Sequence, residues 1–248
     1  MDRLLEATAR AEDRHFWFRG FRRMVRPFIA QAVAHVCRPR LLDCGCGTGG
    51  NLRLLGDFGD ATGFDLTWSG LAIARARGER RVVRASVDSV PFSDATFDGV
   101  TSFDVLYCLE AGLERRAVAE MWRVLKPGGG LVVNVAAMPI LHGDHSIVSA
   151  EVRRYTRQGL QGVLEEAGFA IERLTYTNAA LFPLLLAVRT WQRVTGLSPA
   201  DEALAEITVP LEPVNALLSG ALWAESKVLR IASLPFGSSL LCLARKPA

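Results

Sequence analysis

The stretch LLDCGCGTGG (residues 41–50) decides the fold class, because a short apolar run is followed at once by a loop with four glycines. The apolar run predicts the end of a buried strand, and GNLRLLGDF (50–58) predicts a helix. Glycines at such a junction let the backbone approach a ligand closely, and the first helical amides attract negative charge. The stretch therefore predicts a cofactor-binding loop. Gly45, Gly47 and Gly50 also satisfy G-x-G-x-x-G, so a dinucleotide is a candidate ligand.

Strands and helices alternate around this loop as far as about residue 135. Such spacing predicts right-handed βαβ units and an α/β fold, in which a parallel sheet is covered on both faces. The predicted strands are 40–44, 60–65, 81–87, 97–104, 130–137, 170–176 and 238–246. We expect the helix over 113–125 to end at KPGGG, where a glycine accepts the left-handed conformation of a C-cap.

The change of pattern after residue 137 divides the chain into four segments. Residues 1–37 form a helical N-terminal segment, 38–178 the cofactor-binding core, 179–235 an inserted helical cover, and 236–248 the final strand of the core. The cover is predicted to hold two helices, at about 179–195 and 211–232. Its apolar run over 179–188 is too short to span a bilayer, which takes about 20 residues.

Composition excludes several classes of protein. The 29 Lys and Arg against 26 Asp and Glu give a net charge of +3, which does not predict a nucleic-acid partner. Five cysteines without CxxC or Cys/His spacing predict no metal site and a reducing, cytoplasmic location. The N-terminus is too highly charged for a secretory signal. The arginines between residues 75 and 84 fit either a solvated helix end or an anionic partner.

Two aspartates narrow the choice of ligand. Asp43 directly precedes the glycines, where its carboxylate would repel a pyrophosphate and attract the ammonium of an amino-acid moiety. The alternative is that Asp43 caps the amides of its own loop. Asp65 ends the second predicted strand, 20 residues after Gly45, where a carboxylate accepts both hydroxyls of a ribose. Asp65 therefore indicates an adenosine ligand without choosing between cofactors.

Four motifs, in this order and spacing, resemble a class I S-adenosylmethionine-dependent methyltransferase. They are LLDCGCGTGG, TGFDLTWSGLAIAR, VPFSDATFDGV and RVLKPGGGLVV, and the resemblance covers about residues 40–175. LPFGSSLLCLARKP near the C-terminus fits the last strand of that family, and HFWFRGFRR resembles the N-terminal segment of one bacterial subgroup. The resemblance implies a Rossmann-like seven-stranded sheet of order 3-2-1-4-5-7-6, with the seventh strand antiparallel. It also implies that S-adenosylmethionine is the cofactor and S-adenosylhomocysteine the product.

The resemblance also implies roles for individual residues. Asp43 and the glycine loop would face the methionine part of the cofactor, and Asp65 the ribose. The family's adenine-binding acid is replaced by Ser86, and Asp88 would face the same way if the strand continued. Residues 1–37 would form a lid over the cofactor, with Phe18 or Trp17 near the sulfonium; the alternative is a helix that packs its aromatic face on the core. The predicted cofactor-binding residues are Asp43, Gly45, Cys46, Gly47, Gly49, Asp65, Leu66, Ser86, Val87, Asp88, Phe103, Asp104 and Phe18.

Candidate catalytic residues follow the fourth and fifth predicted strands, where open α/β sheets bind ligands. Methyl transfer requires the protein to place a nucleophile and, where needed, to remove its proton. His145 is the predicted general base because the pKa of histidine lies near neutrality, and Glu151 would orient it. Tyr155 and Arg154 would close over the substrate; the alternative for Arg154 is a pair with a core carboxylate. Cys108 is expected to be a small buried filler.

The leading hypothesis is methyl transfer from S-adenosylmethionine to a small, hydrophobic acceptor. The apolar surface of the two cover helices has three alternative roles: it packs into the domain core, it forms a hydrophobic substrate pocket or membrane interface, or it forms a dimer contact. We expect a small-molecule partner, with lipid-like acceptors included, no nucleic acid, and a monomer or homodimer. Two alternatives stay open: an NAD(P)-dependent oxidoreductase, which predicts no acid before the glycines, and a non-catalytic S-adenosylmethionine-binding partner protein.

Overall fold

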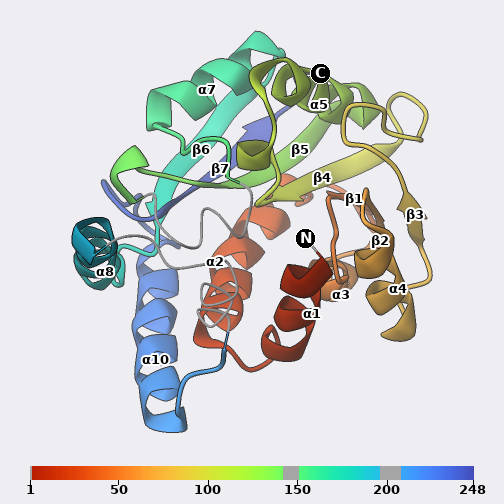
Figure 1. The fold of residues 1–248 in the computed structure, drawn as a ribbon. Helices are drawn as coiled ribbons and strands as arrows, with labels where there is room; N and C mark the ends of the chain where they lie inside the picture. The colour runs from red at the N-terminus through yellow and green to blue at the C-terminus, as the bar shows by residue number, and fades with distance from the viewer. Residues whose placement is uncertain (1, 142–150, 196–207) are drawn as a thin grey trace.

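A seven-stranded sheet of order β3-β2-β1-β4-β5-β7-β6 forms the centre of the computed structural model, which describes residues 2–141, 151–195 and 208–248 (Figure 1). The strands are β1 (Arg40–Cys44), β2 (Asp60–Asp65), β3 (Val82–Arg84), β4 (Phe97–Phe103), β5 (Leu125–Ala136), β6 (Ala170–Thr177) and β7 (Ser239–Arg245). Strands β1 to β5 are parallel, whereas β7 runs antiparallel to both β5 and β6. The predicted fold class, strand order and reversed final strand are confirmed.

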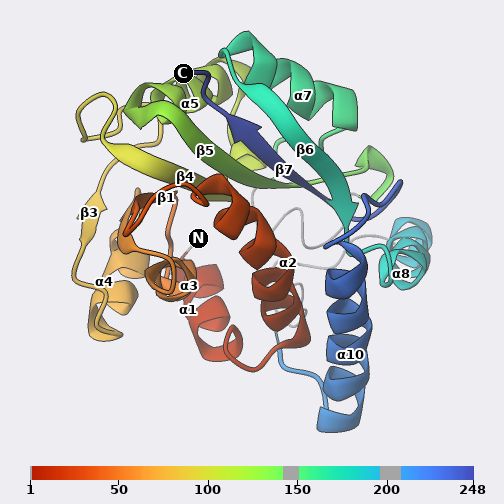
Figure 2. The same cartoon turned by 180° about the vertical axis from the view of Figure 1, so that it is seen from behind.

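Helices cover both faces of the sheet (Figure 2). The described helices are α1 (Asp2–Ala11), α2 (Phe16–Ala32), α3 (Gly50–Gly56), α4 (Trp68–Ala76), α5 (Ala111–Val124), α7 (Arg157–Glu166), α8 (Phe182–Thr195) and α10 (Glu212–Val228). One hydrophobic core joins the sheet to α5 and α7, and a second joins it to α2, α3 and α4. Alternate residues of a strand enter opposite cores: on β5, Leu131 and Val133 face α5, whereas Val132 faces α2. Burial on both faces explains the continuous apolar runs of these strands.

The N-terminal segment consists of two helices, because a turn at residues 12–15 interrupts the helical conformation. His15 is the N-cap of α2, and its Nδ1 accepts the backbone N–H of Trp17 at 3.2 Å. Asn215 of α10 closes the same end: its Oδ1 accepts the N–H of Phe16 at 2.9 Å, and its Nδ2 donates to the carbonyl of Arg14 at 3.1 Å. Helix α10 therefore packs along α2, and both expected helices of the cover are present as α8 and α10.

The expected C-cap at KPGGG is wrong. Helix α5 ends at Val124, and the chain passes at once into β5, which includes the glycines. Gly130 serves close approach: a Cβ there would lie 2.6 Å from the Cβ of Ala32, so glycine lets α2 lie directly against β5. Gly128 takes the left-handed conformation, φ +75°, but inside the strand segment and not as the cap of α5. The third strand is also shorter than expected, since β3 ends at Arg84 and residues 86–89 form a turn.

None of the described helices combines the length and the apolar character that crossing a bilayer requires. All five cysteines are free thiols.

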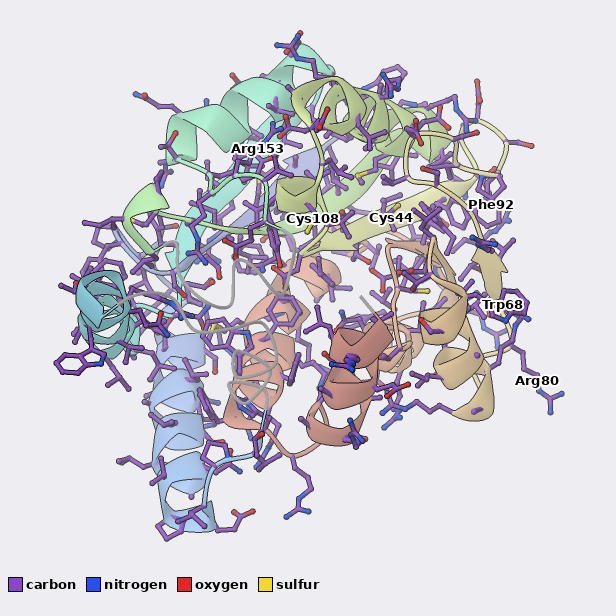
Figure 3. The ribbon with its side chains drawn as sticks, in the orientation of Figure 1. Cys44, Trp68, Arg80, Phe92, Cys108 and Arg153 are labelled. Atoms are coloured by element: carbon purple, nitrogen blue, oxygen red, sulfur yellow. The ribbon has the colours of Figure 1, made fainter. Side chains whose placement is uncertain are left out.

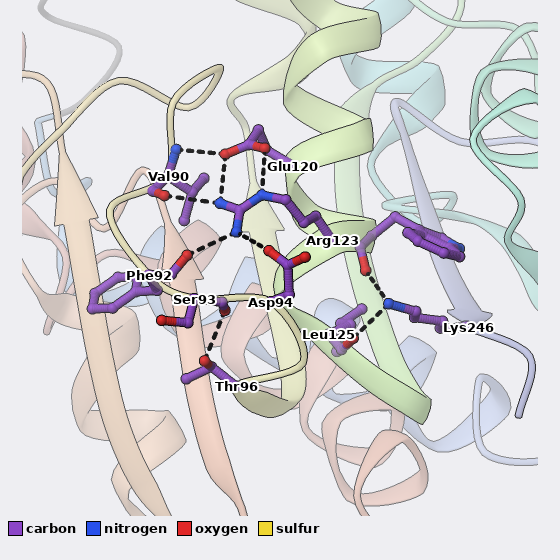
Figure 4. Close-up of polar contacts among 10 residues, drawn as sticks. Val90, Phe92, Ser93, Asp94, Thr96, Glu120, Arg123, Leu125 and Lys246 are labelled. Atoms are coloured by element: carbon purple, nitrogen blue, oxygen red, sulfur yellow. Dashed lines mark hydrogen bonds and ion pairs between the residues drawn. The ribbon is translucent and has the colours of Figure 1, made fainter.

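Arg123 ties the loop after β3 to helix α5 (Figure 4). Its guanidinium donates to the carbonyls of Val90 at 3.0 Å and Phe92 at 2.9 Å, and to the carboxylates of Asp94 and Glu120, both at 2.6 Å. The hydrogen bonds that Arg123 donates to Glu120 and Asp94 raise the pKa of Arg123, so the guanidinium stays charged. One side chain thus holds the turn that follows β3.

Replacing Arg123 with methionine should lower the free energy of unfolding by about 2–3 kcal/mol, because several charge-assisted hydrogen bonds and two backbone partners are lost. Urea denaturation followed by circular dichroism measures the effect. Arg115→Met is the matched control on the same helix, since Arg115 makes an exposed pair with Glu166 at 3.3 Å. That pair should contribute less than about 1 kcal/mol. Equal losses in the two variants would contradict the role given to Arg123.

Candidate active site

The glycine loop runs from the end of β1 to the start of α3. Gly45 has φ +83° and Gly49 has φ +80°, a left-handed conformation that side chains rarely adopt. A Cβ on Gly45 would collide with Cγ2 of Val105, the residue after Asp104. The N–H groups of Gly45 and Cys46 both donate to the carbonyl of Phe64 at 2.9 Å. The loop is therefore held against the ends of β2 and β4, with little room for side chains.

Asp43 lies at the carboxyl end of β1 and is 1% exposed. Its Oδ1 accepts the hydroxyl of Thr101 at 2.7 Å, and its Oδ2 is buried with no hydrogen-bond partner in the described part of the chain. Burial raises the pKa of Asp43 to about 7, against the hydrogen bond from Thr101, which lowers it; nearby Asp65 raises it slightly more. The alternative in which Asp43 caps the loop amides is not what these contacts show. An unpaired buried carboxylate oxygen is costly and favours a cationic partner.

Asp65, not Asp43, is the carboxylate that binds the loop amides. Its Oδ2 accepts the N–H of Gly47 at 2.8 Å, and its Oδ1 accepts both the N–H and the hydroxyl of Thr67, at 2.8 and 2.5 Å. A carboxylate has about four acceptor sites, so about one remains for a ribose hydroxyl. Any second ribose hydroxyl must displace one of these internal donors.

The residues that the resemblance predicts to bind the adenine ring lie in the turn after β3. Because β3 ends at Arg84, Asp88 does not continue a strand, but the Ser86 hydroxyl donates to the Asp88 carboxylate and brings the two candidates together. Val87 is buried at their side, whereas Leu66 is 61% exposed after Asp65. An apolar side chain so exposed beside Asp65 is available to a flat ring.

The aromatic candidates separate into two places. Phe103 is buried in the core and meets Phe21 of α2 edge-on at 5.1 Å between ring centroids. Phe18 contacts His15 in the same geometry at 5.8 Å. Trp17, the other aromatic side chain considered, lines a cavity. The structure thus brings Trp17 to the cavity, whereas no described contact places Phe18 there.

S-adenosylmethionine fits these residues on two observations. The unpaired Oδ2 of Asp43 suits an ammonium group, and a backbone held open by glycine leaves space that a Cβ would fill. Leu66 and Asp65 then lie at the end of the neighbouring strand, where an adenosine would extend. A pyrophosphate fits poorly, because it would bring negative charge to Asp43.

A cavity lies at the carboxyl ends of β4 and β5 and the start of β7. Its walls combine apolar and polar groups, and they come from the core, from α2 and from α8. The lining residues are Trp17, Asp104, Tyr107, Ala136, Leu141, Glu151, Arg154, Leu185, Arg189, Ser238 and Ser239. The cavity adjoins the glycine loop, since Val105, which contacts Gly45, directly follows Asp104.

Asp104 sits at the cavity wall in a left-handed conformation, φ +61°. Its Oδ1 accepts from Nδ2 of Asn134 at 2.8 Å, and its backbone N–H donates to the carbonyl of Asn134 at 3.0 Å. The side chain is exposed, but toward the cavity that it lines. Desolvation by the surrounding protein raises the pKa of Asp104 to about 7, against the hydrogen bond from Asn134.

Glu151 and Arg154 form a buried bidentate ion pair at the cavity. Nε and Nη2 of Arg154 donate to the two carboxylate oxygens at 2.9 and 3.0 Å, and Nη1 donates to the carbonyl of Ala137 at 3.0 Å. Arg154 thus pairs with a carboxylate, as its alternative role predicted. His145, which Glu151 was expected to orient, lies outside the described residues.

The structure places the Tyr155 hydroxyl away from the cavity. Tyr155 is buried, and its hydroxyl donates to the carboxylate of Glu114 on α5. Arg153 donates to the same carboxylate at 2.6 Å and to the carbonyl of Leu109 at 2.6 Å. Tyr155 therefore belongs to a buried polar network under the cavity, and no described contact gives it a part in chemistry.

Cys46 and Cys108, which lie near the site, are poor nucleophiles. Burial raises the pKa of the Cys108 thiol to about 12 and that of Cys46 well above its ordinary value. Cys44 and Cys108 lie near the middle of the molecule (Figure 3). Both remain protonated thiols at neutral pH, as expected for buried fillers.

The arginine run over 75–84 does not form one patch. Arg80 points away from the molecule near Trp68 (Figure 3), and Arg81 pairs with Asp60 at 2.9 Å. Arg77 instead turns inward to Glu12, which follows α1. The Glu12 carboxylate also accepts the Thr48 hydroxyl at 3.0 Å, so α1 is joined to the glycine loop.

Asn134 and Glu12 are among the residues of the site that were missed from the sequence. Asn134 is a single polar residue inside the apolar run LVVNVAA, and that interruption is the signal that marks it. Glu12 lies among other charged residues and carries no such signal. Among the described residues, no group of three potential ligands is placed to hold a metal ion.

Comparison with known proteins agrees with this geometry. A methyltransferase-domain family model matches residues 42–133. The ubiquinone/menaquinone biosynthesis C-methyltransferase UbiE of Vibrio cholerae is 29% identical over 197 residues, which cover 64% of this chain and 74% of the relative. The O-methyltransferase cnsE of Penicillium expansum is 30% identical over 208 residues, 75% of this chain and 71% of the relative.

The fold agrees as well. The crystal structure of a putative methyltransferase of Bacillus halodurans superposes with a TM-score of 0.58 at 21% identity, covering 90% of this chain and 99% of that one. The sheet order, the glycine loop that follows Asp43, and these similarities to known proteins all indicate the same family. The chain belongs to the class I S-adenosylmethionine-dependent methyltransferases.

Proposed function

We propose that this chain transfers the methyl group of S-adenosylmethionine to a small, largely apolar acceptor bound in the cavity. The observation that carries the proposal is the adjacency of the two sites: Val105 packs against Gly45, and the preceding Asp104 lines the cavity. A methyl group held over the glycine loop would face an acceptor in that cavity.

The proposed binding roles follow the contacts of each residue. Asp43 receives the ammonium, because its Oδ2 is buried and unpaired in the described part of the chain. Asp65 receives the ribose. Leu66 and the Ser86–Asp88 pair hold the adenine, with the backbone of Val87 beside them. The loop itself supplies a close-fitting backbone surface at Gly45, Cys46, Gly47 and Gly49.

S-adenosylmethionine supplies, when bound, an electrophilic methyl carbon on a good leaving group. The protein's part is to bind, orient and exclude water. Trp17 of α2 and Leu185 of α8 supply apolar walls from opposite ends of the chain. The described parts of residues 1–37 and 179–235 are therefore the two proposed covers of the acceptor site, through α2 and α8.

The acceptor class is inferred from the walls and from the relatives. Trp17, Tyr107, Leu141 and Leu185 favour a flat or branched apolar molecule. One relative is named for quinone biosynthesis as a C-methyltransferase and another as an O-methyltransferase, so both carbon and oxygen acceptors have precedent. An apolar acceptor with one polar reacting group fits these facts together.

Binding and turnover test the proposal in two steps. Calorimetry should show binding of S-adenosylmethionine and S-adenosylhomocysteine and none of NADH. The purified chain should then methylate members of a panel of small phenols, quinols and amines, read out by mass spectrometry. Preference for NADH would support the oxidoreductase alternative. Tight S-adenosylhomocysteine binding without turnover of any acceptor would support a non-catalytic binding protein and overturn the proposed activity.

A further inference from the structure

We propose that Asp104, held in place by Asn134, takes the proton of the acceptor, and that the acceptor is accordingly a phenol or an enol. The inference rests on the proposed function and deepens it, by naming the base and the class of reacting group.

The geometry of the pair is that of a positioned base. Asp104 follows the last residue of β4, and Asn134 lies on the neighbouring β5, so the sheet fixes their separation. Asn134 holds Asp104 twice, through its carbonyl at 3.0 Å and its side-chain amide at 2.8 Å. The second oxygen, Oδ2, has no hydrogen-bond partner in the described part of the chain, and Asp104 is open to the cavity. One oxygen is thus fixed and the other available.

A left-handed aspartate at this point is a further mark of function. Asp104 has φ +61°, which costs a non-glycine residue free energy unless its surroundings enforce it. The hydrogen bond from its N–H to Asn134 enforces it here. This conformation, directly after the end of β4, directs the Asp104 carboxylate toward the cavity.

The other titratable groups described around the cavity are less suited to accept a proton. Both oxygens of Glu151 accept from Arg154. Burial raises the pKa of Tyr107 well above its ordinary value and that of Cys108 to about 12, so both hold their protons at neutral pH. Arg189 is a cation. Asp104 is the remaining acceptor among these residues.

The raised pKa of Asp104 allows its carboxylate to accept a proton from the hydroxyl of a phenol or an enol. Desolvation, helped by the charge of Glu151, raises the pKa of Asp104 to about 7, against the hydrogen bond from Asn134 and the charge of Arg154, which lower it. A carboxylate with a pKa near 7 is deprotonated at slightly alkaline pH, and it can accept the proton of a hydroxyl that becomes more acidic as its oxygen is methylated. Phenols and enols must lose a proton as they are methylated, whereas a neutral amine attacks through its lone pair and needs no base beforehand.

The step balances as follows in atoms and charge. The bond from the acceptor oxygen to the methyl carbon forms while the carbon–sulfur bond breaks, and that electron pair stays on sulfur. The proton of the hydroxyl moves to Oδ2 of Asp104. Asp104 later returns it to water, and no oxidant or other reactant is needed.

The test compares Asp104→Asn with the control Glu165→Gln, which removes the same charge from the exposed face of α7. With phenolic acceptors, Asp104→Asn should lower kcat about 10²- to 10⁴-fold with little change in KM and in S-adenosylhomocysteine affinity. The acid limb of the wild-type kcat profile, near pH 7, should disappear. In Asn134→Leu that limb should move to higher pH by about one unit, because the hydrogen bond to the charged form is lost.

A second readout needs no turnover. In chain labelled with ¹³C-aspartate and saturated with S-adenosylhomocysteine, one carboxyl resonance should titrate near pH 7 and be missing from Asp104→Asn. Retained kcat in Asp104→Asn, or no such resonance, overturns the inference even if methylation is confirmed. Failure to bind S-adenosylhomocysteine would instead overturn the proposed function. Turnover of amines alone, with an unchanged rate in Asp104→Asn, would also refute the inference.

Discussion

Asp43→Asn should bind S-adenosylhomocysteine roughly 30- to 1,000-fold more weakly than the wild type, which corresponds to about 2–4 kcal/mol. The substitution keeps the shape of the side chain and the Thr101 hydrogen bond, but removes the charge. An ammonium group would then face a neutral amide at a buried position, where charge pairing is little screened by solvent. The loss should therefore persist at high salt.

The same substitution should make the ligand-free chain more stable at alkaline pH. The folded pKa of Asp43 is about 7, raised from 3.8, so between these values the folded state holds a proton that the unfolded state has lost. Stability from this group is present below pH 3.8 and is lost as pH rises to about 7. The linkage amounts to about 4 kcal/mol at most. Asparagine removes that penalty, and because its own amide hydrogens stay unpaired, we expect a gain of about 1–3 kcal/mol at pH 8.

Calorimetry at several pH values and thermal unfolding of the ligand-free chain measure the two effects. Wild-type affinity should fall about tenfold per pH unit below pH 7, because protonation of Asp43 competes with the ligand, whereas Asp43→Asn should show a flat profile. Asp60→Asn is the control: Asp60 starts β2 and pairs with Arg81 at the surface. Unchanged affinity in Asp43→Asn would remove the electrostatic basis for the cofactor assignment.

The part of this site that lies in the glycine loop could be predicted because its residues are adjacent in the chain. Asp43, Gly45 and Gly49 form one strand-to-helix turn, and local spacing sets their geometry. The strand order was implied by the resemblance, while the alternation of strands and helices alone predicted the parallel sheet. Both follow from patterns that extend over many residues and tolerate local errors.

Pairs formed across the sheet could not be predicted in the same way. Asn134 meets Asp104 because β4 and β5 align Phe103 with Asn134, and that register depends on the bulge between Phe97 and Gly99. Tyr155, in the segment before α7, meets Glu114 on α5 across 41 residues of sequence, because α5 and α7 cover the same face of the sheet. Sequence spacing of 30 or more residues carries no information about such contacts.

The error at KPGGG has a different origin. Glycine after a helix is typical of a C-cap, and that local rule competed with a tertiary requirement for close packing between α2 and β5. Gly130 meets Ala32, nearly 100 residues earlier, so the requirement is invisible in the local sequence.

Glu114→Leu should lower the free energy of unfolding by about 3–5 kcal/mol, the second large effect that we expect. Glu114 is 3% exposed and accepts from both Arg153 and Tyr155. Removing it leaves a partly buried guanidinium and a buried hydroxyl without their acceptor. Glu110→Leu at the N-cap of the same helix is the control, because the Glu110 side chain makes no capping hydrogen bond.

Glu114→Leu should also weaken acceptor binding while leaving the cofactor site intact. The N–H groups of Val152 and Arg153 donate to the carbonyl of Tyr107 at 2.9 and 3.2 Å, and Arg153 then ties this segment to Glu114. Glu151 and Arg154 of the same segment line the cavity. A loosened segment should therefore raise KM for the acceptor without changing S-adenosylhomocysteine affinity.

A double-mutant cycle separates a structural role from a simple loss of packing. Arg153→Leu combined with Glu114→Leu should recover much of the lost stability, since the charge left without a partner is gone. The coupling free energy from urea denaturation should reach about 1–3 kcal/mol. Strictly additive losses would mean that Glu114 acts through packing alone, and that the network beneath the cavity does not fix residues 151–155. A coupled pair whose loss raises only the acceptor KM would place this network among the determinants of substrate binding, even though none of its polar groups reaches the acceptor.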